Sequence, residues 1–163
     1  GASEGERSRC LAILREAERE GAERGEIVPG TLELLAALRE YGVACALVTN
    51  NSRRSVETVL ARHPMPFDLV MSRDDGAMKP DARALLLPLE RLGVPPQDAM
   101  AIGDAHLDAL AAHGAGVANI LLVHLPDWMR SHIPPDVPYR EARDLFEARE
   151  IVLSLCRGAG ARG

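Results

Sequence analysis

Short apolar runs of strand length alternate with helix-favouring segments along this chain, and this alternation limits the possible folds more than any other feature. The apolar runs span 43–48, 67–71, 99–102 and 120–124, and the helical patterns occupy 4–24, 32–42, 52–62, 81–92, 107–113 and 141–156. Continuous apolar runs are typical of parallel strands with helices on both faces. The pattern predicts an α/β fold with a doubly wound parallel sheet.

Proline-rich and glycine-rich segments mark departures from this regularity. Pro88 lies inside a helical pattern, where the missing N–H and the ring clash cost roughly 3 kcal/mol, so we expect a kink or break between Ala84 and Pro88. The stretch 125–139 contains four prolines and is predicted to be a surface connection. Residues 158–163 are predicted to be a disordered tail.

Composition supports one compact domain and excludes broad binding to nucleic acid. The chain has 163 residues, 47% of them apolar, with 19 basic and 24 acidic residues and a net charge of -5. Its apolar runs are shorter than the roughly 18 residues that span a membrane. Cys10, Cys45 and Cys156 form no Cys-x-x-Cys pair, which indicates free thiols and a cytoplasmic location.

Three polar clusters directly follow predicted strands. They are Thr49-Asn50-Asn51, Lys79-Pro80-Asp81, and Gly103-Asp104 together with Asp108. Each cluster alone is more often ordinary turn or helix-start chemistry. Loops at the carboxyl ends of parallel strands meet at one edge of the sheet, however, so the order of the three clusters predicts a shared ligand site.

The same segments resemble motifs II, III and IV of the haloacid dehalogenase superfamily. The matching stretches are Leu47-Val48-Thr49-Asn50, Lys79-Pro80-Asp81 and Ala101 to Asp108, and the segments 28–30 and 111–116 are also typical of that superfamily. The resemblance covers about residues 26 to 156. It implies a Rossmann-like core and a phosphatase similar to phosphoglycolate phosphatase, acting on a small phosphorylated metabolite.

The resemblance also implies a role for each polar residue. The Thr49 hydroxyl and the Asn50 backbone N–H would hold the transferring phosphoryl group, and Lys79 would neutralise the phosphate and the nucleophilic carboxylate. Asp104 would coordinate Mg²⁺, and Asp108 would do so directly or through a second layer of hydrogen bonds.

Other polar residues near these clusters are expected to have ordinary roles. His106, His113 and His124 have no metal-ligand spacing, so solvation or packing is expected. The segment 73–75 is expected to be a solvated charged loop, with phosphate or substrate contact as the alternative.

The first motif of the superfamily, Asp-x-Asp-x-Thr or Val, does not occur in this sequence. We expect residues 1–25 to be the remnant of a short helical cap, residues 26–157 to be the core, and the strand bearing the nucleophile to lie upstream of Gly1. Two functions stay open. The chain is part of an active Mg²⁺-dependent phosphatase that uses an aspartyl-phosphate intermediate, which the retained site residues favour, or it is a non-catalytic module that binds a phosphate group or a protein partner.

In the superfamily the first strand lies between the strands that here end at Val48 and Ile102. Without it, the chain alone is expected to be inactive. Neighbouring strands lie about 4.8 Å apart, so the loss would leave backbone groups unpaired across about 10 Å. We expect these two strands to pair with each other, or a segment of another copy of the chain or an upstream peptide to fill the position.

Overall fold

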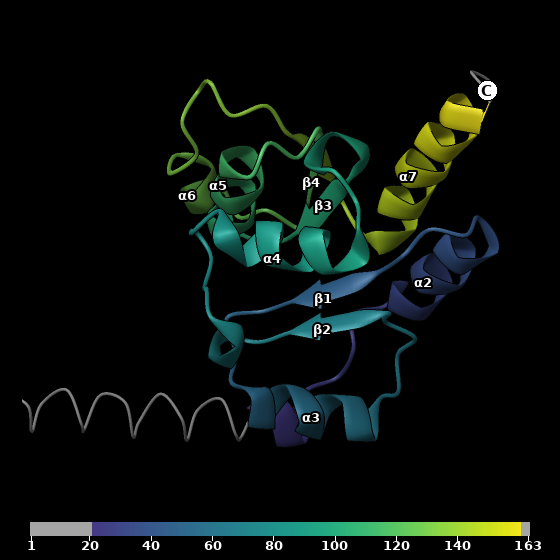
Figure 1. Ribbon diagram of the computed structural model, residues 1–163, viewed down its shortest axis with the longest axis vertical. Coiled ribbons are helices and arrows are strands. Elements are labelled where there is room, and N and C mark those ends of the chain that lie inside the picture. Colours follow the sequence, from purple (N-terminus) through teal and green to yellow (C-terminus); the bar gives the residue numbers. More distant parts are fainter. Residues whose placement is uncertain (1–20, 161–163) are drawn as a thin grey trace, which may run out of the picture.

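Strands and helices alternate along residues 21–160, the part of the chain that the computed structural model describes (Figure 1). Residues 21–24 are helical, and residues 1–20 of the predicted cap segment lie outside the described residues. The elements that follow are α2 (Thr31–Glu40), β1 (Ala46–Val48), α3 (Arg53–Arg62), β2 (Leu69–Met71), η1 (Arg73–Asp75), α4 (Arg83–Leu92), η2 (Pro96–Asp98), β3 (Met100–Gly103), α5 (His106–Gly114), β4 (Asn119–Val123), α6 (Asp127–Arg130), β5 (Arg140–Ala142) and α7 (Leu145–Gly160).

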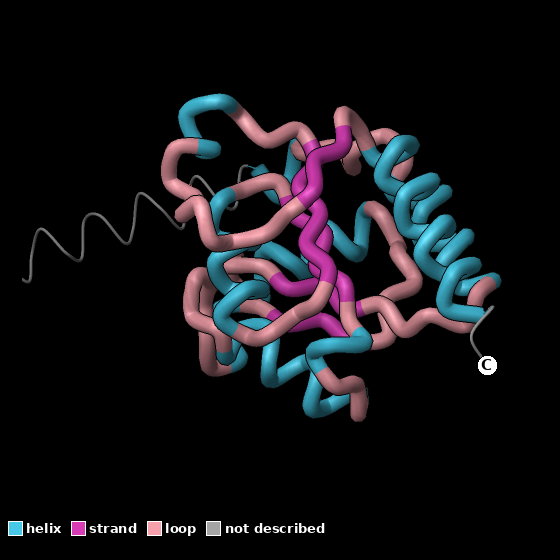
Figure 2. Tube along the Cα trace, turned by 90° about the horizontal axis from the view of Figure 1, so that it is seen from above, coloured by secondary structure: helices cyan, strands magenta, loops and turns pink. Residues whose placement is uncertain are grey.

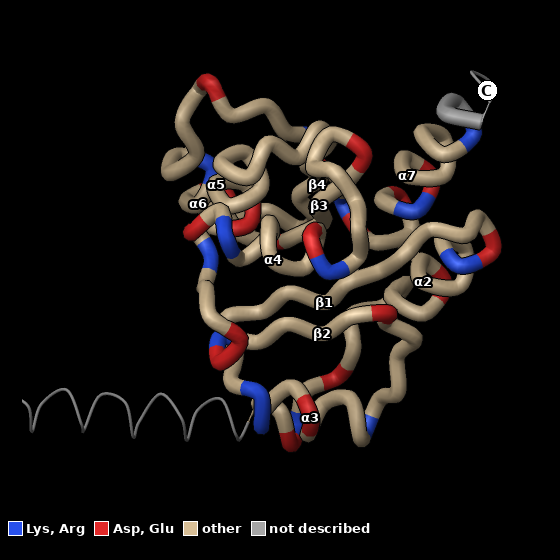
Figure 3. Tube along the Cα trace, in the orientation of Figure 1, with Lys and Arg blue, Asp and Glu red and all other residues tan. Residues whose placement is uncertain are grey.

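The strands run parallel, as the alternation predicts. β1 pairs with β2, and β4 pairs with both β3 and β5. In the view from above, the strands run through the middle of the molecule and helices lie on either side of them (Figure 2). Strands β1 to β4 consist of uncharged residues, and the charges lie mainly on helices and loops (Figure 3). The predicted α/β class with a parallel sheet is confirmed.

Strand β4 is the centre of the core because both of its faces are covered. Ile120 and Leu122 belong to a cluster with apolar residues of α5, such as Ala109. Leu121 and Val123 point the other way and belong to a second cluster, with residues of α2 and α7. Successive side chains of a strand point to opposite faces, so one apolar run joins two helical layers.

β1 and β3 do not pair with each other in the described part of the chain. The strands form a two-stranded sheet, β1-β2, and a three-stranded sheet, β3-β4-β5. Pairing between β1 and β3, the first of the two expected outcomes, is therefore not observed. Each sheet is packed against its own helix, α4 on β1 and β2 and α5 on β3 and β4. Pairing of β1 with β3 would therefore have to move both helices together with their sheets. What fills the position between β1 and β3 stays a prediction.

Of the kink or break expected at Pro88, the break is not observed. Helix α4 runs without interruption from Arg83 to Leu92 with Pro88 inside it. Pro88 has no N–H to donate to the carbonyl oxygen of Ala84, which lies four residues earlier in the first turn of the helix. A single backbone hydrogen bond is therefore lost. The proline ring is buried, and this apolar contact offsets part of the cost.

The segment after β4 contains structure that the sequence analysis missed. The connection 125–139 includes the short helix α6, and β5 forms where the closing helix was expected to begin. That helix, α7, begins only at Leu145, because the Asp144 carboxylate accepts the Glu147 N–H at 2.8 Å and caps it. It extends to Gly160, into the segment predicted as a tail; residues 161–163 lie outside the described part. No helix within residues 21–160 has the length and apolar character to cross a bilayer.

Candidate active site

The predicted site residues follow three strands at their carboxyl ends. Thr49 and Asn50 come after β1, Lys79 lies in the loop after β2, and Asp104 follows β3 directly. Hydrogen bonds join the three loops, since Lys79 contacts both the end of β1 and Asp108 in the first turn of α5. The carboxyl ends of strands in the two sheets therefore bring together residues that lie far apart in the sequence.

The Lys79 ammonium group lies between two acceptors. Its Nζ is 3.1 Å from the Val48 carbonyl oxygen and 2.5 Å from Oδ1 of Asp108. The Lys79 and Asp108 side chains are only 17% and 12% exposed, so the ion pair is largely shielded from water. An ammonium group has three protons, so a third donor is available for a phosphoryl oxygen.

Lys79 is also the only lysine of the chain, because the other 18 of its 19 basic residues are arginines. This single lysine is a signal in the sequence that could have marked the site. A compact ammonium group can turn its protons towards differently placed acceptors, whereas the planar guanidinium of arginine suits paired oxygens. The change of residue type at this one position fits a site that requires a point charge.

Asp108 links Lys79 to the loop after β3. Its Oδ2 accepts the backbone N–H groups of Asp104 at 3.1 Å and Ala105 at 3.0 Å, while Oδ1 faces Lys79. Gly103 allows this arrangement, since a Cβ added there would lie 2.3 Å from Cγ of Asp108. Both carboxylate oxygens of Asp108 are thus engaged by protein donors.

The residues fit a divalent cation at Asp104. Its exposed carboxylate is a hard oxygen ligand at the carboxyl edge of the sheet. Mg²⁺ commonly uses one or two carboxylates and completes its shell with water and phosphate oxygens, so a single carboxylate is compatible with it. Within residues 21–160 there is no group of three or more His, Cys, Asp or Glu residues that could hold a metal ion. Asp108, with both oxygens engaged, suits an indirect role.

Thr49 and Asn50 have different surroundings. The Thr49 hydroxyl oxygen accepts the Asn51 N–H at 3.1 Å, which leaves its own proton available to a ligand. The Asn50 side chain points to the backbone of Lys79, accepting its N–H and donating to its carbonyl oxygen, both at 2.9 Å. This side-chain contact was not expected from the sequence, which pointed only to the backbone N–H of Asn50.

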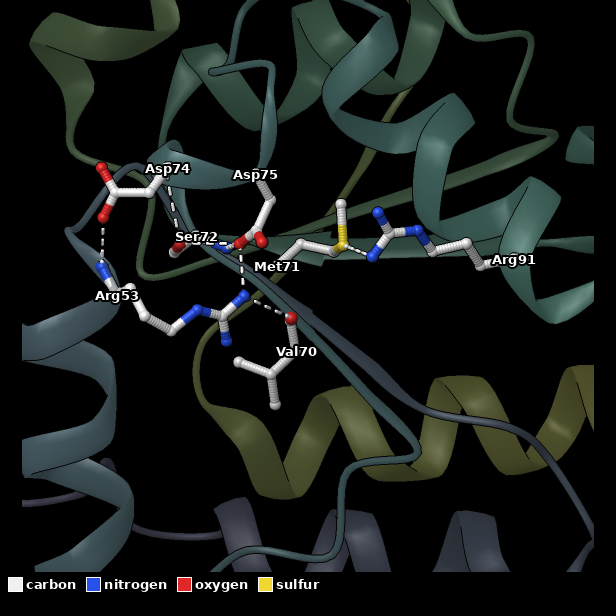
Figure 4. Close-up of polar contacts among 7 residues, drawn as sticks. All are labelled: Arg53, Val70, Met71, Ser72, Asp74, Asp75 and Arg91. Carbon is white, nitrogen blue, oxygen red and sulfur yellow. Dashed lines mark hydrogen bonds and ion pairs between the residues drawn. The ribbon is translucent and has the colours of Figure 1, made fainter.

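The segment 73–75 is more ordered than a solvated loop, which corrects the favoured expectation. The Asp75 carboxylate accepts the N–H and the hydroxyl of Ser72, both at 2.7 Å, and forms an ion pair with Arg53 (Figure 4). The bonds from Arg53 and Ser72 hold the pKa of Asp75 well below its usual value. No sequence signal pointed to Arg53, because 22 positions separate it from Asp75.

The histidines have surroundings that agree with packing and solvation. The His106 ring is 5.2 Å from that of His132, and its Nδ1 is buried without a hydrogen-bond partner among the described residues. His113 and His124 are exposed.

Comparisons with known proteins agree with the geometry. A family model described as haloacid dehalogenase-like hydrolase matches residues 2–116. Phosphoglycolate phosphatase 1 of Pseudomonas aeruginosa is 33% identical over 162 residues, which cover 94% of this chain and 60% of the relative. Phosphoglycolate phosphatase of Escherichia coli is 33% identical over 135 residues, 79% of this chain and 54% of the relative.

A solved structure of similar fold is that of a CbbY variant from Rhodobacter sphaeroides in complex with xylulose-(1,5)bisphosphate. It is 25% identical, with a TM-score of 0.71, over 90% of this chain and 68% of the other. The chain spans 54% to 60% of the length of the two curated relatives.

Proposed function

Because the chain belongs to the haloacid dehalogenase-like hydrolase family, we propose that it forms the core of a Mg²⁺-dependent phosphatase acting on a small phosphorylated metabolite. The observation that carries this proposal is the shielded Lys79–Asp108 ion pair, which lies at the carboxyl edge of the sheet in the loops that follow β2 and β3. The names of the relatives support a phosphoglycolate-like substrate, and CbbY was crystallised with a sugar bisphosphate. The shared chemistry is a phosphoryl group on a small metabolite.

In this proposal, residues of the chain hold the phosphoryl group while its ester bond breaks. The Thr49 hydroxyl and the Asn50 N–H donate to phosphoryl oxygens, and the third proton of Lys79 does the same. Asp108 keeps the ammonium group in place through its own two backbone bonds. A fixed donor aimed at developing charge commonly accounts for a factor of about 10² to 10³ in kcat, so the loss of any one of these contacts should lower kcat measurably.

Asp104 would hold Mg²⁺ together with water and phosphate oxygens. The bound ion would supply further charge neutralisation at the phosphoryl group.

Cys45 and Cys156 are free thiols, which supports a reducing, cytoplasmic location.

The attacking group would come from the first motif of the family, which this sequence does not contain. Its first aspartate carboxylate would form an oxygen–phosphorus bond as the ester oxygen leaves with a proton from the second aspartate of that motif. Water would then hydrolyse the aspartyl phosphate, which releases inorganic phosphate and restores the carboxylate. The unpaired edges of β1 and β3 offer a place for a strand bearing that motif. We propose that a peptide carrying that motif supplies the strand in this position, since another copy of this chain could fill the position but would bring no nucleophile.

Removing the charge of Lys79 tests the proposal. In a form of the protein that carries the first motif, Lys79→Ala should lower kcat for 2-phosphoglycolate and p-nitrophenyl phosphate with Mg²⁺ by about 10²-fold or more. Arg83→Ala is the matched control, because Arg83 is exposed and pairs with Asp81 near the same loop. Near-normal turnover in Lys79→Ala would contradict the proposed role. Phosphate binding without turnover in the same motif-bearing form without the substitution would instead favour the non-catalytic module.

A further inference from the structure

The position of the Lys79 ammonium group depends on the backbone that carries it. A lysine side chain is long and flexible, so a fixed peptide is needed before the ammonium group can rest between two defined acceptors. The loop from Ser72 to Ala82 lies between β2 and α4 and contains only the short turn η1. Some other part of the molecule must therefore hold this loop.

Asn50 holds the loop at Lys79 itself. The side-chain amide makes two 2.9 Å bonds to one residue, accepting its N–H and donating to its carbonyl oxygen. One planar amide group thus satisfies both backbone groups of Lys79, as a neighbouring strand would. Aspartate at this position would keep the acceptor but lack the donor, and alanine would lack both.

Arg53 holds the same loop at its beginning. The backbone N–H of Arg53 donates to Oδ2 of Asp74 at 2.7 Å, and its guanidinium group donates to the Val70 carbonyl oxygen at 3.2 Å and to Asp75 (Figure 4). Ser72, which is only 2% exposed, closes the turn by bonding to Asp75. The turn is therefore fixed against the start of α3.

Both anchors come from the segment that runs from the end of β1 to the first residue of α3. This segment also carries Thr49, whose N–H donates to the Met71 carbonyl oxygen at 3.0 Å, and Asn51, whose carbonyl oxygen accepts the Arg73 N–H at 3.0 Å. The two loops are thus joined by backbone bonds beyond the ends of the strands. We infer that Asn50 and Arg53 are positioning residues that hold the Lys79 loop in register with β1 and so place the ammonium group for a phosphoryl oxygen. This inference rests on the proposed function.

The single lysine makes a direct test possible on the chain itself. Labelling with ¹⁵N-lysine gives one backbone amide signal and one side-chain ammonium signal, both from Lys79. Hydrogen exchange of the amide reports the bond to Asn50, and the ammonium signal follows a titration with inorganic phosphate. The variants are Asn50→Ala, Asn50→Asp and Arg53→Gln. The matched controls are Asn51→Ala and Arg54→Gln, which change exposed neighbours of the same type.

Asn50→Ala should speed Lys79 amide exchange by about tenfold and weaken phosphate binding by about fivefold or more, because the loop loses two bonds. Asn50→Asp should stay within about threefold of wild-type exchange, since it keeps the acceptor. Arg53→Gln should speed exchange by about threefold, and the controls should change neither quantity.

Exchange and phosphate affinity within about twofold of wild type in both Asn50→Ala and Arg53→Gln would overturn the inference. If Asn50→Ala does not fold, Arg53→Gln still decides it, because Lys79 amide exchange and phosphate affinity within about twofold of wild type in that variant contradict the inference. Phosphate that leaves the ammonium signal of the unmodified chain unchanged would contradict the proposed function, whereas amide exchange would still report the positioning.

Discussion

Replacing Gly103 with alanine should disrupt the site through Asp108 without removing any polar group. The new Cβ would lie 2.3 Å from Cγ of Asp108 and 2.4 Å from its Cβ and Oδ2. Carbon atoms that are not bonded rest about 3.5–4.0 Å apart, so the two side chains must separate by more than about 1 Å. Helix α5 cannot retreat easily, because its Ala109 and Ala112 are fully buried in the core. The Asp108 side chain must therefore turn away.

The cost follows from the bonds that Asp108 would lose. It accepts two backbone N–H groups and pairs with Lys79, and bonds of this charged kind each contribute about 1.5–3 kcal/mol. Water would replace part of this loss at the edge of the sheet, while overpacking adds about 1–3 kcal/mol. We expect a net loss of about 3 kcal/mol in the free energy of unfolding.

Urea unfolding followed by far-UV circular dichroism measures this loss. Gly114→Ala is the control, since its Cβ would meet only the Cβ of Ala82, at 3.3 Å, and we expect a change below about 1 kcal/mol. If Gly103→Ala unfolds within about 0.5 kcal/mol of wild type, the close approach of Asp108 to Gly103 does not constrain the site, and the argument is refuted.

Two further predictions concern acid stability and activity. The native pKa of Asp75 lies below the usual value of about 3.9, so its contacts stabilise the fold fully above that pH, and this stability is lost as the pH falls from there through the lower native pKa. Asp75→Asn should therefore have a lower free energy of unfolding than wild type at pH 7. In urea unfolding, the variant should lose less stability than wild type between about pH 5 and pH 2. A pH dependence equal to that of wild type would count against a stabilising role of the Asp75 carboxylate. The purified chain alone should not hydrolyse p-nitrophenyl phosphate with Mg²⁺, and turnover that Asp104→Asn abolishes would show that it needs no added nucleophile.

The fold class was readable from the sequence because its cause is local. The apolar runs of strand length contain β1 to β4, whose own residues are uncharged, and helical patterns separate them. Burial on both faces requires such residues wherever the strand pairs. The location of Lys79 and Asp104 after strands followed from the same pattern, since parallel strands place their carboxyl ends at one edge.

The tertiary structure alone decided the features that depend on distant partners. β5 contains two charged residues, Arg140 and Glu141, and forms because β4 offers a free backbone edge, which no local pattern reveals. Asn50 and Arg53 acquire their roles only when the loops after β1 and β2 lie side by side. Pro88 is tolerated because of its place in α4 and its burial. A side chain's hydrogen-bond partners are set by which backbones the fold brings within about 3 Å, and sequence spacing does not contain that information.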